Sequence, residues 1–335
     1  MNDNDEDEIQ IKKVNPNDVY ESLKNSKFRQ QKLPAWRPYP TILSTTIIFI
    51  SFGLVSLALG IVLLIYADDI IEIKKRYDNI NECLPEKIMC TIEIEIKEKM
   101  KKNVIVYYEF TNFFQNHRRY MKSKSNDQLQ GKSFTLEEME DSGDCKPATT
   151  NEQMGKSNSI DNTPLNQSDI AIPCGLMAKA YPQEKFTLSV KGGENIQIND
   201  SNISWKADRE KLFKNLLDSS ESSWKTKQWI DMTDEHFIVW MRPSNLPDFR
   251  KLYGRIERDL EKGNYTLKIE NLYNTSQYKG EKYFILTTVN AFGGKNYFLA
   301  ISYIVFGGLC LLLAVVFVIV YSCKSSPFSK VTKKE

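Results

Sequence analysis

The chain has 335 residues, and its 45 basic and 43 acidic side chains leave a net charge of +2. A charge this well balanced gives no general attraction to nucleic acid. The mean hydropathy of −0.43 is typical of a water-soluble protein, but the average conceals two long apolar runs. These runs exclude an ordinary soluble globular protein.

Residues 41–67 form the first apolar run, "TILSTTIIFISFGLVSLALGIVLLIYA", in which Tyr66 is the one ionisable side chain. A helix needs about 20 apolar residues to cross the hydrocarbon core, where every backbone polar group must bond within its own segment. The alternative, a buried helix of a globular protein, rarely keeps so long a stretch free of charge. The run also begins too far from the N-terminus for a cleaved signal peptide. We therefore predict a transmembrane helix over 41–67.

The charges beside the apolar runs predict the orientation of the chain. Positive side chains gather on the cytosolic side of membrane spans. Residues 22–40 hold five bases and no acid, and residues 322–335 hold four lysines and one acid. The first charged residues after the first run are acidic. We therefore predict cytosolic tails at 1–40 and 322–335, and a lumenal or extracellular ectodomain at 68–296.

Four cysteines lie in the ectodomain: Cys83, Cys90, Cys145 and Cys174. An even count in an oxidising compartment indicates two disulfides. Three pairings are open, and we favour Cys83–Cys90 with Cys145–Cys174 because each closes the shorter loop. The second bridge would hold a segment whose middle is too polar to order itself by burial.

The ectodomain also contains five N-x-S/T triplets, at Asn166, Asn199, Asn202, Asn264 and Asn274. Any one such triplet can arise by chance. Their position between the two apolar runs agrees with N-glycosylation on the lumenal side.

Most of the ectodomain has the pattern of β-strands. In "TIEIEIKEK", isoleucines alternate with charged residues over 92–97, which is the period of a half-buried strand. Five further segments are β-rich: "NVIVYYEF", "KFTLSV", "HFIVWM", "NYTLKIENL" and "KYFILTTV". One helix is expected over 246–263, where the apolar residues share a face, Pro247 suits the first turn and Gly263 the end.

Residues 297–321, "YFLAISYIVFGGLCLLLAVVFVIVY", form the second apolar run and contain no charged side chain. We predict a second transmembrane helix here, with Cys310 in its packing and Cys323 as a candidate for palmitoylation. The predicted fold class is a membrane protein of α+β type. Two transmembrane helices flank a large, antiparallel, sandwich-like ectodomain that is disulfide-bonded and glycosylated.

No motif for catalysis or nucleotide binding is present in the sequence. It lacks G-x-x-x-x-G-K-[ST], G-x-S-x-G, H-E-x-x-H and paired C-x-x-C motifs. With His117 and His236 as the only histidines, a multi-histidine metal site is not expected. We predict no enzyme activity, no metal and no cofactor.

The stretch "QNHRRY" places His117 beside Arg118 and Arg119. An extracytosolic position disfavours nucleic acid as its ligand. We favour a structural role, in which the arginines stack on Tyr120 or pair with acidic neighbours. Contact with a partner protein is the alternative, and catalysis is the least supported.

Long blocks of the sequence resemble a known family. In order, they are "FRQQKLPAWRPYP", "YYEFTNFFQNHRRYMKSKSNDQLQG", "IAIPCGLMAKA", "DEHFIVWMRPSNLPDFRKLYGRI" and "FGGKNYFLAISYIVFGG". Together they resemble the accessory (beta) subunits of type-IV P-type ATPases, the phospholipid flippases, from about Phe28 to the end of the second span. Blocks in a fixed order are far more specific than one short motif.

The resemblance implies a non-catalytic subunit that forms a heterodimer with the catalytic ATPase among membrane lipids. Such a subunit is needed for the ATPase to leave the endoplasmic reticulum, and it supports ATP-driven movement of aminophospholipid to the cytosolic leaflet. The complex would reside in the endoplasmic reticulum, Golgi, endosomes or plasma membrane. The chain agrees in lacking the D-K-T-G-T phosphorylation motif.

Several residues become candidates for contact with that partner. In the span helices, glycines at 53, 60, 307 and 308 would let backbones approach closely. Trp240, Phe249 and Tyr253 are expected in the core rather than at the interface. The interface candidates are Trp36, Arg37, His117, Arg118, Arg119, Arg242 and Arg250. For Trp36 and Arg37, a simple anchor at the membrane surface is the alternative.

Two other functions share this topology. A two-span ligand-gated channel subunit usually has more ectodomain cysteines and polar positions facing a pore, whereas these spans offer scattered Ser and Thr. A membrane-tethered ectoenzyme would need a catalytic constellation, which the sequence does not provide.

Overall fold

The computed structural model describes residues 16–32, 41–80, 83, 88–217 and 224–325. The chain divides into two compact units. One takes the chain up to Ala58 and from Ile304 onward, and the other runs from Leu59 to Tyr303. The candidates Trp36 and Arg37 lie outside the described residues.

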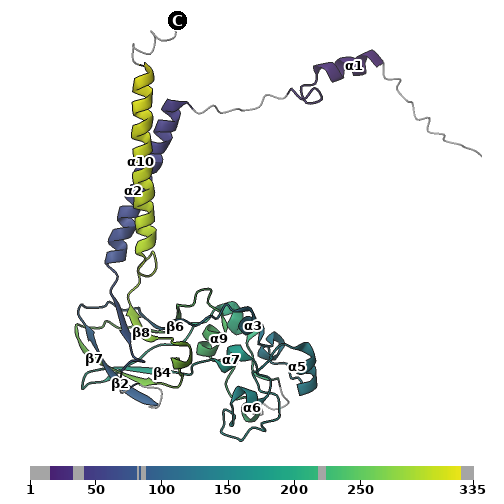
Figure 1. Cartoon of the computed structure of the whole chain (residues 1–335), viewed down its shortest axis with the longest axis vertical. Helices are drawn as coiled ribbons and strands as arrows, with labels where there is room; N and C mark the ends of the chain where they lie inside the picture. Colours follow the sequence, from purple (N-terminus) through teal and green to yellow (C-terminus); the bar gives the residue numbers. More distant parts are fainter. Residues whose placement is uncertain (1–15, 33–40, 81–82, 84–87, 218–223, 326–335) are drawn as a thin grey trace, which may run out of the picture. The chain divides into compact units, whose positions relative to one another are not determined.

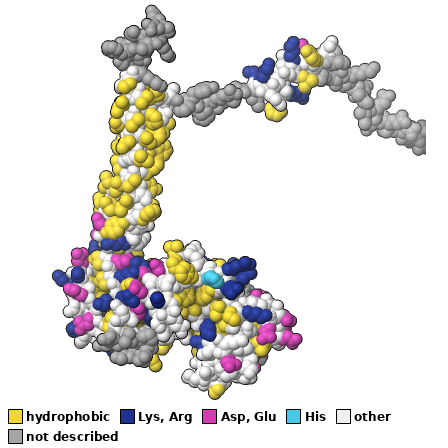
Figure 2. Space-filling model, in the orientation of Figure 1, with side chains coloured by type: hydrophobic (Ala, Val, Ile, Leu, Met, Phe, Trp, Pro, Cys, Tyr) yellow, Lys and Arg dark blue, Asp and Glu magenta, His cyan; other side chains and the backbone are white. Residues whose placement is uncertain are grey.

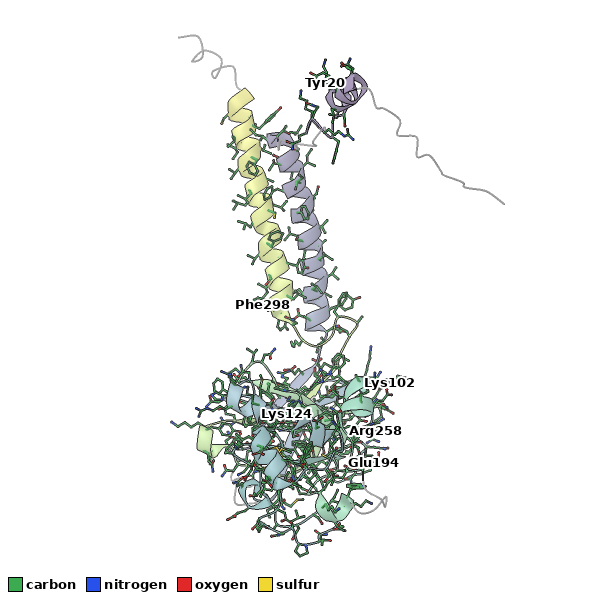
Figure 3. All side chains as sticks on the ribbon, turned by 90° about the vertical axis from the view of Figure 1, so that its right-hand side faces the viewer. Tyr20, Lys102, Lys124, Glu194, Arg258 and Phe298 are labelled. Carbon is green, nitrogen blue, oxygen red and sulfur yellow. A yellow bond between two sulfur atoms is a disulfide. The ribbon has the colours of Figure 1, made fainter. Side chains whose placement is uncertain are left out.

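Two long helices dominate the ends of the chain, α2 (Ile42–Asp68) and α10 (Tyr297–Ser325), and the shorter α1 (Pro16–Asn25) precedes them. Both long helices are apolar on all sides, and most of their surface is exposed (Figure 3). Phe298, near the start of α10, is 81% exposed. A helix that is apolar all round and uncovered requires a lipid environment. The two spans are therefore transmembrane helices.

Within the first unit, α2 and α10 pack where side chains are missing. A Cβ added to Gly53 would lie 2.7 Å from Cδ2 of Leu311, and one added to Gly307 would lie 2.9 Å from the carbonyl oxygen of Gly53. The rings of Phe49 and Phe317 have their centroids 5.6 Å apart. Gly308 differs, because an added Cβ would meet nothing within 4 Å. Gly53 and Gly307 therefore allow close backbone approach between the two helices of this chain, and contact of the span glycines with a partner stays a prediction.

The second unit contains two antiparallel sheets of four strands each (Figure 1). The first has the order β1 (Glu72–Arg76), β8 (Lys282–Thr287), β3 (Val104–Phe110) and β6 (Phe249–Ile256). The second has the order β2 (Met89–Ile96), β7 (Gly263–Glu270), β4 (Lys185–Val190) and β5 (Asn195–Ile196). The expected strands at β2, β3, β4, β7 and β8 are confirmed.

The two sheets form a sandwich around one apolar core. In β2 the burial alternates residue by residue, so Ile92, Ile94 and Ile96 all point inward. Phe186 of β4 joins the layers, because its ring lies 5.3 Å from Phe284 of β8 and 4.9 Å from Tyr253 of β6. The sandwich-like ectodomain predicted from strand alternation is confirmed.

Short helices fill the connections of the sandwich. They are α3 (Arg118–Lys122), α4 (Asn126–Leu129), α5 (Leu136–Ser142), α6 (Asn151–Met154), α7 (Leu176–Lys179), α8 (Trp224–Lys227) and α9 (Glu235–Met241). A π-helical turn covers Asp208–Leu212, and a 3-10 turn covers Ser276–Tyr278. Helices this short are not stable alone. Thr135 and Thr150 start α5 and α6 with capping boxes, which satisfy the free backbone N–H groups.

Two segments have the opposite structure to the one expected. Within the helix expected over 246–263, residues 249–256 form strand β6 instead, and the strand expected at "HFIVWM" is helix α9. Strand β6 pairs along its length with β3, from Phe110↔Phe249 to Val104↔Ile256, and this ladder replaces helical hydrogen bonds. Helix α9 begins at Asp234, whose side chain accepts a 2.8 Å hydrogen bond from the His236 backbone N–H.

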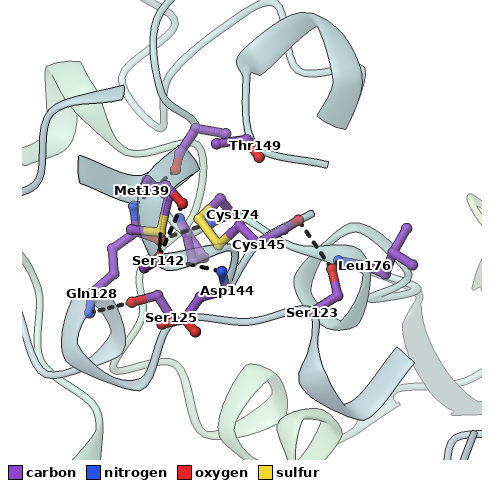
Figure 4. The surroundings of a disulfide bond; sticks show 12 residues. Ser123, Ser125, Gln128, Met139, Ser142, Asp144, Cys145, Thr149, Cys174 and Leu176 are labelled. Atoms are coloured by element: carbon purple, nitrogen blue, oxygen red, sulfur yellow. Dashed lines mark hydrogen bonds between the residues drawn. A yellow bond between two sulfur atoms is a disulfide. The ribbon is translucent and has the colours of Figure 1, made fainter. Parts of the chain in front are cut away.

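Disulfides join Cys83 to Cys90 and Cys145 to Cys174, with Cα–Cα distances of 5.0 and 5.6 Å. These pairings close the shorter loops. Ser123 links both sides of the second bridge (Figure 4). Its hydroxyl donates to the carbonyl of Cys145 over 3.1 Å and accepts from the N–H of Leu176 over 2.8 Å.

The polar segment between Cys145 and Cys174 is ordered by more than this bridge. Its backbone forms hydrogen bonds across the loop, among them Ala171 N–H to the carbonyl of Thr149 at 2.9 Å. Met154 and Asn151 are each 2% exposed. The segment is therefore held by the bridge, by hydrogen bonds across the loop and by a few buried side chains together.

A buried ion pair connects the layers of the sandwich. Lys282 of β8 and Glu184, just before β4, each have side chains 2% exposed, and Nζ lies 2.5 Å from Oε1. Nζ also donates to the carbonyl of Tyr273 over 2.5 Å, and Tyr77 donates its hydroxyl to Glu184. Burial raises the pKa of Glu184, against the opposing effect of Lys282. The pair fixes the ends of strands from both sheets.

Candidate partner-binding surface

The described part of the chain contains no group of three or more His, Cys, Asp or Glu residues that could hold a metal ion. Its two histidines lie on separate elements, His117 before α3 and His236 in α9.

Basic and apolar side chains gather on one surface of the second unit (Figure 2). We call the following set the basic patch: His117, Arg118, Arg119 and Lys122, with the apolar Phe114, Met121 and Leu246. All seven are exposed, and the three apolar side chains have exposed fractions of 55%, 40% and 68%. Cations next to exposed apolar groups are typical of a protein interface.

The cations of the basic patch have no acidic partner among the residues that the structure describes. No ion pair links His117, Arg118, Arg119 or Lys122 to an acid among the described residues. The expected stacking of the arginines on Tyr120 is wrong as well. Tyr120 is turned inward, and its ring packs edge-on against Phe113 at 5.6 Å. The structural role that the sequence favoured for these arginines therefore does not hold.

Alternating burial holds the basic patch in place. In the loop before α3, Phe113 and Gln115 point inward, whereas Phe114 and Asn116 are exposed. Phe113 lies 5.7 Å from Trp240 between ring centroids, and Gln115 is fully buried. Gln115 Oε1 accepts the N–H of Ser244 over 2.9 Å. The exposed residues thus project from a loop that is anchored by the packed Phe113 and the hydrogen-bonded Gln115.

Hydrogen bonds also connect the segment around Leu246 to the loop that holds Phe113 and Asn116. Asn116 Nδ2 donates to the carbonyl of Asn245 over 2.8 Å, and the Phe113 N–H donates to the carbonyl of Pro247 over 3.0 Å. The sequence-based prediction did not include the exposed apolar residues of the patch, Phe114, Met121 and Leu246. The available signal was the alternation across "TNFFQN", which could have separated an inward from an outward phenylalanine.

Arg242 and Arg250 bind carboxylates of the chain itself. Arg242 Nε lies 2.5 Å from Asp208, and its guanidinium lies 4.8 Å from the Trp205 ring centroid. Arg250 of β6 donates to Glu109 of β3 over 2.8 Å and to both oxygens of Glu72 in β1 over 2.8 and 3.0 Å. Both arginines therefore stabilise the ectodomain, whatever else they contact.

The other predicted residues are placed as follows. Trp240 and Phe249 are buried and Tyr253 is half-buried, so their assignment to the core is confirmed. Of the triplet asparagines, Asn199 is half-buried and the others are exposed: Asn166, Asn202, Asn264 and Asn274. In the second span helix, Cys310 is buried and Cys323 is exposed.

Comparison with known proteins supplies the context for this surface. Residues 63–327 match the LEM3 (ligand-effect modulator 3) family / CDC50 family. "ALA-interacting subunit 3" of Arabidopsis thaliana is 36% identical over 296 residues, covering 81% of this chain and 78% of that protein. "Putative ALA-interacting subunit 2" of the same plant is 35% identical over 292 residues, covering 80% and 78%. "Cell cycle control protein 50A" of Mus musculus is 32% identical over 310 residues, covering 80% of each.

The family match includes the end of the first span helix, the whole ectodomain and the second span helix. Two transmembrane helices, an antiparallel sandwich and two disulfides stand where hydropathy, strand alternation and cysteine spacing predicted them. The chain belongs to the LEM3/CDC50 family, the non-catalytic accessory subunits of type-IV P-type ATPases, and is an accessory subunit rather than an enzyme.

Proposed function

We propose that this chain binds a type-IV P-type ATPase as a heterodimer, accompanies it out of the endoplasmic reticulum and supports its transport of aminophospholipid to the cytosolic leaflet. The observation that carries the proposal is the family match over 63–327. Relatives named as ALA-interacting subunits support it further. Family membership leaves no ground for a channel subunit or an ectoenzyme.

The proposal includes a topology. Tails 1–40 and 322–335 lie in the cytosol, spans 41–67 and 297–321 cross the bilayer, and 68–296 faces the lumen or the exterior. The basic residues of the two tails, which lie next to the spans, support this orientation. So do the two disulfides, which persist in oxidising compartments. Glycans on the triplet asparagines would follow from it, and the complex would reside in the endoplasmic reticulum, Golgi, endosomes or plasma membrane.

We assign the basic patch to contact with the catalytic subunit. Its exposed cations form no ion pair with the described acids of the chain, so an acidic surface that binds them would not have to displace such a pair. Phe114 and Leu246 add exposed apolar area, which gains free energy when it is covered. Trp36 and Arg37 remain candidates for a second contact on the cytosolic side.

Copurification in mild detergent tests the proposal. A catalytic subunit with the D-K-T-G-T motif is expected to accompany the tagged chain, and deletion of the chain is expected to retain that ATPase in the endoplasmic reticulum. The double variant Arg118→Ala, Arg119→Ala should reduce copurification about tenfold or more, as the loss of interface arginines commonly does.

The matched control is the double variant Lys101→Ala, Lys102→Ala, which removes two exposed bases outside the basic patch. It should copurify at the normal level. Equal loss in both double variants would show that only overall charge matters and would reject the patch. Normal export of the ATPase in the deletion strain would reject the proposed function itself.

A further inference from the structure

The second unit contains a cavity of about 610 Å³ that the accessory role does not use. It lies where the loop before β4 meets the start of α9 and the middle of β6. We call it the acidic aromatic cavity, after six of the residues that line it: Tyr181, Trp229, Tyr253, Asp200, Asp231 and Asp234. Its size suits a small organic molecule.

The charge of this cavity is negative. Asp200, Asp231 and Asp234 line it, with Lys185 as the one lysine among its described lining residues. Lys185 is directed to solvent, with a side chain 71% exposed and 3.9 Å from Glu270. The lining residue Glu184 is already neutralised by Lys282. The three aspartates have partners within the chain, since Asp231 accepts from Asn215 and Thr233, Asp234 accepts the His236 N–H, and Asp200 lies 3.3 Å from His236 Nε2. Their carboxylates would still attract a cation and repel an anion.

The aromatic rings of the cavity suit a cation. Burial first, and then the charge of Asp234, raises the pKa of Tyr181, while burial and the charge of Asp200 raise that of Tyr253. Both side chains therefore stay neutral phenols near carboxylates. Neutral rings beside carboxylates are the surroundings in which proteins hold ammonium groups.

The chain already places one ammonium group against the wall of this cavity. Lys156 Nζ lies 4.2 Å from the ring centroid of Trp229 and donates to Gln183 Oε1 over 3.2 Å. The ring of His236 lies tilted over Tyr253 with centroids 4.5 Å apart. Its buried Nδ1 has no hydrogen-bond partner in the described structure, and its Nε2 lies 3.3 Å from Asp200. A cation of the chain thus already contacts one of the aromatic rings that line the cavity.

We propose that the acidic aromatic cavity binds a small organic cation of the alkylammonium class. The rings would contact the alkyl groups through cation–π attraction, and the three carboxylates would balance the charge. A bare metal ion is not the expected ligand, because no cluster of three or more potential metal ligands exists among the described residues. The proposal does not depend on the accessory function.

The test uses the full chain, purified in a maltoside detergent that carries no ammonium group. Calorimetric titration with choline is expected to show binding. The uncharged isostere 3,3-dimethyl-1-butanol, which has the same shape, should bind at least about tenfold more weakly if charge decides recognition. Equal affinity for both, or no binding of choline up to millimolar concentration, would overturn the proposal.

Variants locate the site and identify the source of the cation. Asp200→Asn and Tyr181→Leu should each weaken choline binding roughly threefold to tenfold, whereas Asp141→Asn, an exposed carboxylate on α5, should not. Unchanged affinity in both cavity variants would reject this cavity as the site. A second titration with glycerophosphocholine separates the two sources of the cation. Tighter binding of glycerophosphocholine than of choline would point to a lipid headgroup, and weaker binding would point to a free alkylammonium ion.

Discussion

In the helix pair of the first unit, packing depends on missing side chains, whereas the ectodomain packs around an apolar core that also encloses a buried ion pair. Gly53 and Gly307 bring α2 and α10 together because any Cβ there would collide with the other helix. In the sandwich, Lys282 and Glu184 are 2% exposed and bind each other. Lipid offers no hydrophobic gain for packing helices together, so close contact must supply the attraction there. Water does drive the ectodomain to bury its apolar side chains, and the ion pair is a cost that its partners offset.

The largest effect is expected from Lys282→Met. This variant leaves the Glu184 carboxylate buried without its cation, which should cost about 3–5 kcal/mol of unfolding free energy. Denaturant unfolding of the purified chain measures the loss. The double variant Lys282→Met, Glu184→Leu removes both charges and should recover much of it. If the double variant were as unstable as the single one, the ion pair would not be the cause.

A pH-dependent effect of the same order is expected at Lys251. Burial lowers the pKa of Lys251 from 10.5 to about 7, although Nζ donates to the carbonyl of Val239 over 3.4 Å. Between these values the unfolded chain binds more protons than the folded chain, so stability falls as pH falls from about 10.5 to 7 and then levels off. The slope is about 1.4 kcal/mol per pH unit. Unfolding curves of Lys251→Met should lack this slope, and a slope that persists would contradict the assignment.

An intermediate effect is expected in the helix pair. Gly307→Leu forces side-chain atoms against the Gly53 carbonyl and Leu57, so it should weaken the pairing of α2 and α10 by about 1–3 kcal/mol. Gly308→Leu is the matched control, because a Cβ there meets nothing within 4 Å. Cysteine cross-linking between the helices would report the pairing. Loss of cross-linking in both variants would mean that position 307 has no special role.

The smallest effect on stability is expected in the basic patch. Arg118→Ala with Arg119→Ala should change the unfolding free energy by less than about 0.5 kcal/mol, because these exposed side chains form no internal ion pair with described residues. Arg250→Ala should cost about 1–3 kcal/mol, since it leaves Glu109, 8% exposed, without one of its cations. Thermal unfolding measures both. A larger loss in the double variant than in Arg250→Ala would reverse the assignment of structural and binding arginines.

The sequence was sufficient where one strong local pattern decided the structure. The alternation in β2 and the two uncharged runs needed no information from elsewhere in the chain. It was misleading at α9 and β6, where apolar residues recur at spacings compatible with either structure. There the outcome depended on distant partners: the Asp234 cap with burial of Phe237 and Trp240 made one a helix, and β3 made the other a strand.

The candidate sites divide in the same way. Exposure of Arg118 and Arg119 could not be read from their neighbours, because it depends on Tyr120 turning inward to meet Phe113. The internal roles of Arg242 and Arg250 depend on acids at positions 208, 109 and 72, each far away along the chain.

The sequence by itself determined that this protein has two transmembrane helices, a β-rich ectodomain and membership of an accessory-subunit family. These features follow from run length, residue alternation and the order of long blocks, all of which can be read directly along the chain. Only the tertiary structure decided which cations are free, which charges are buried and where a cavity forms. Burial and charge pairing are properties of residues that meet after folding, so no local pattern specifies them.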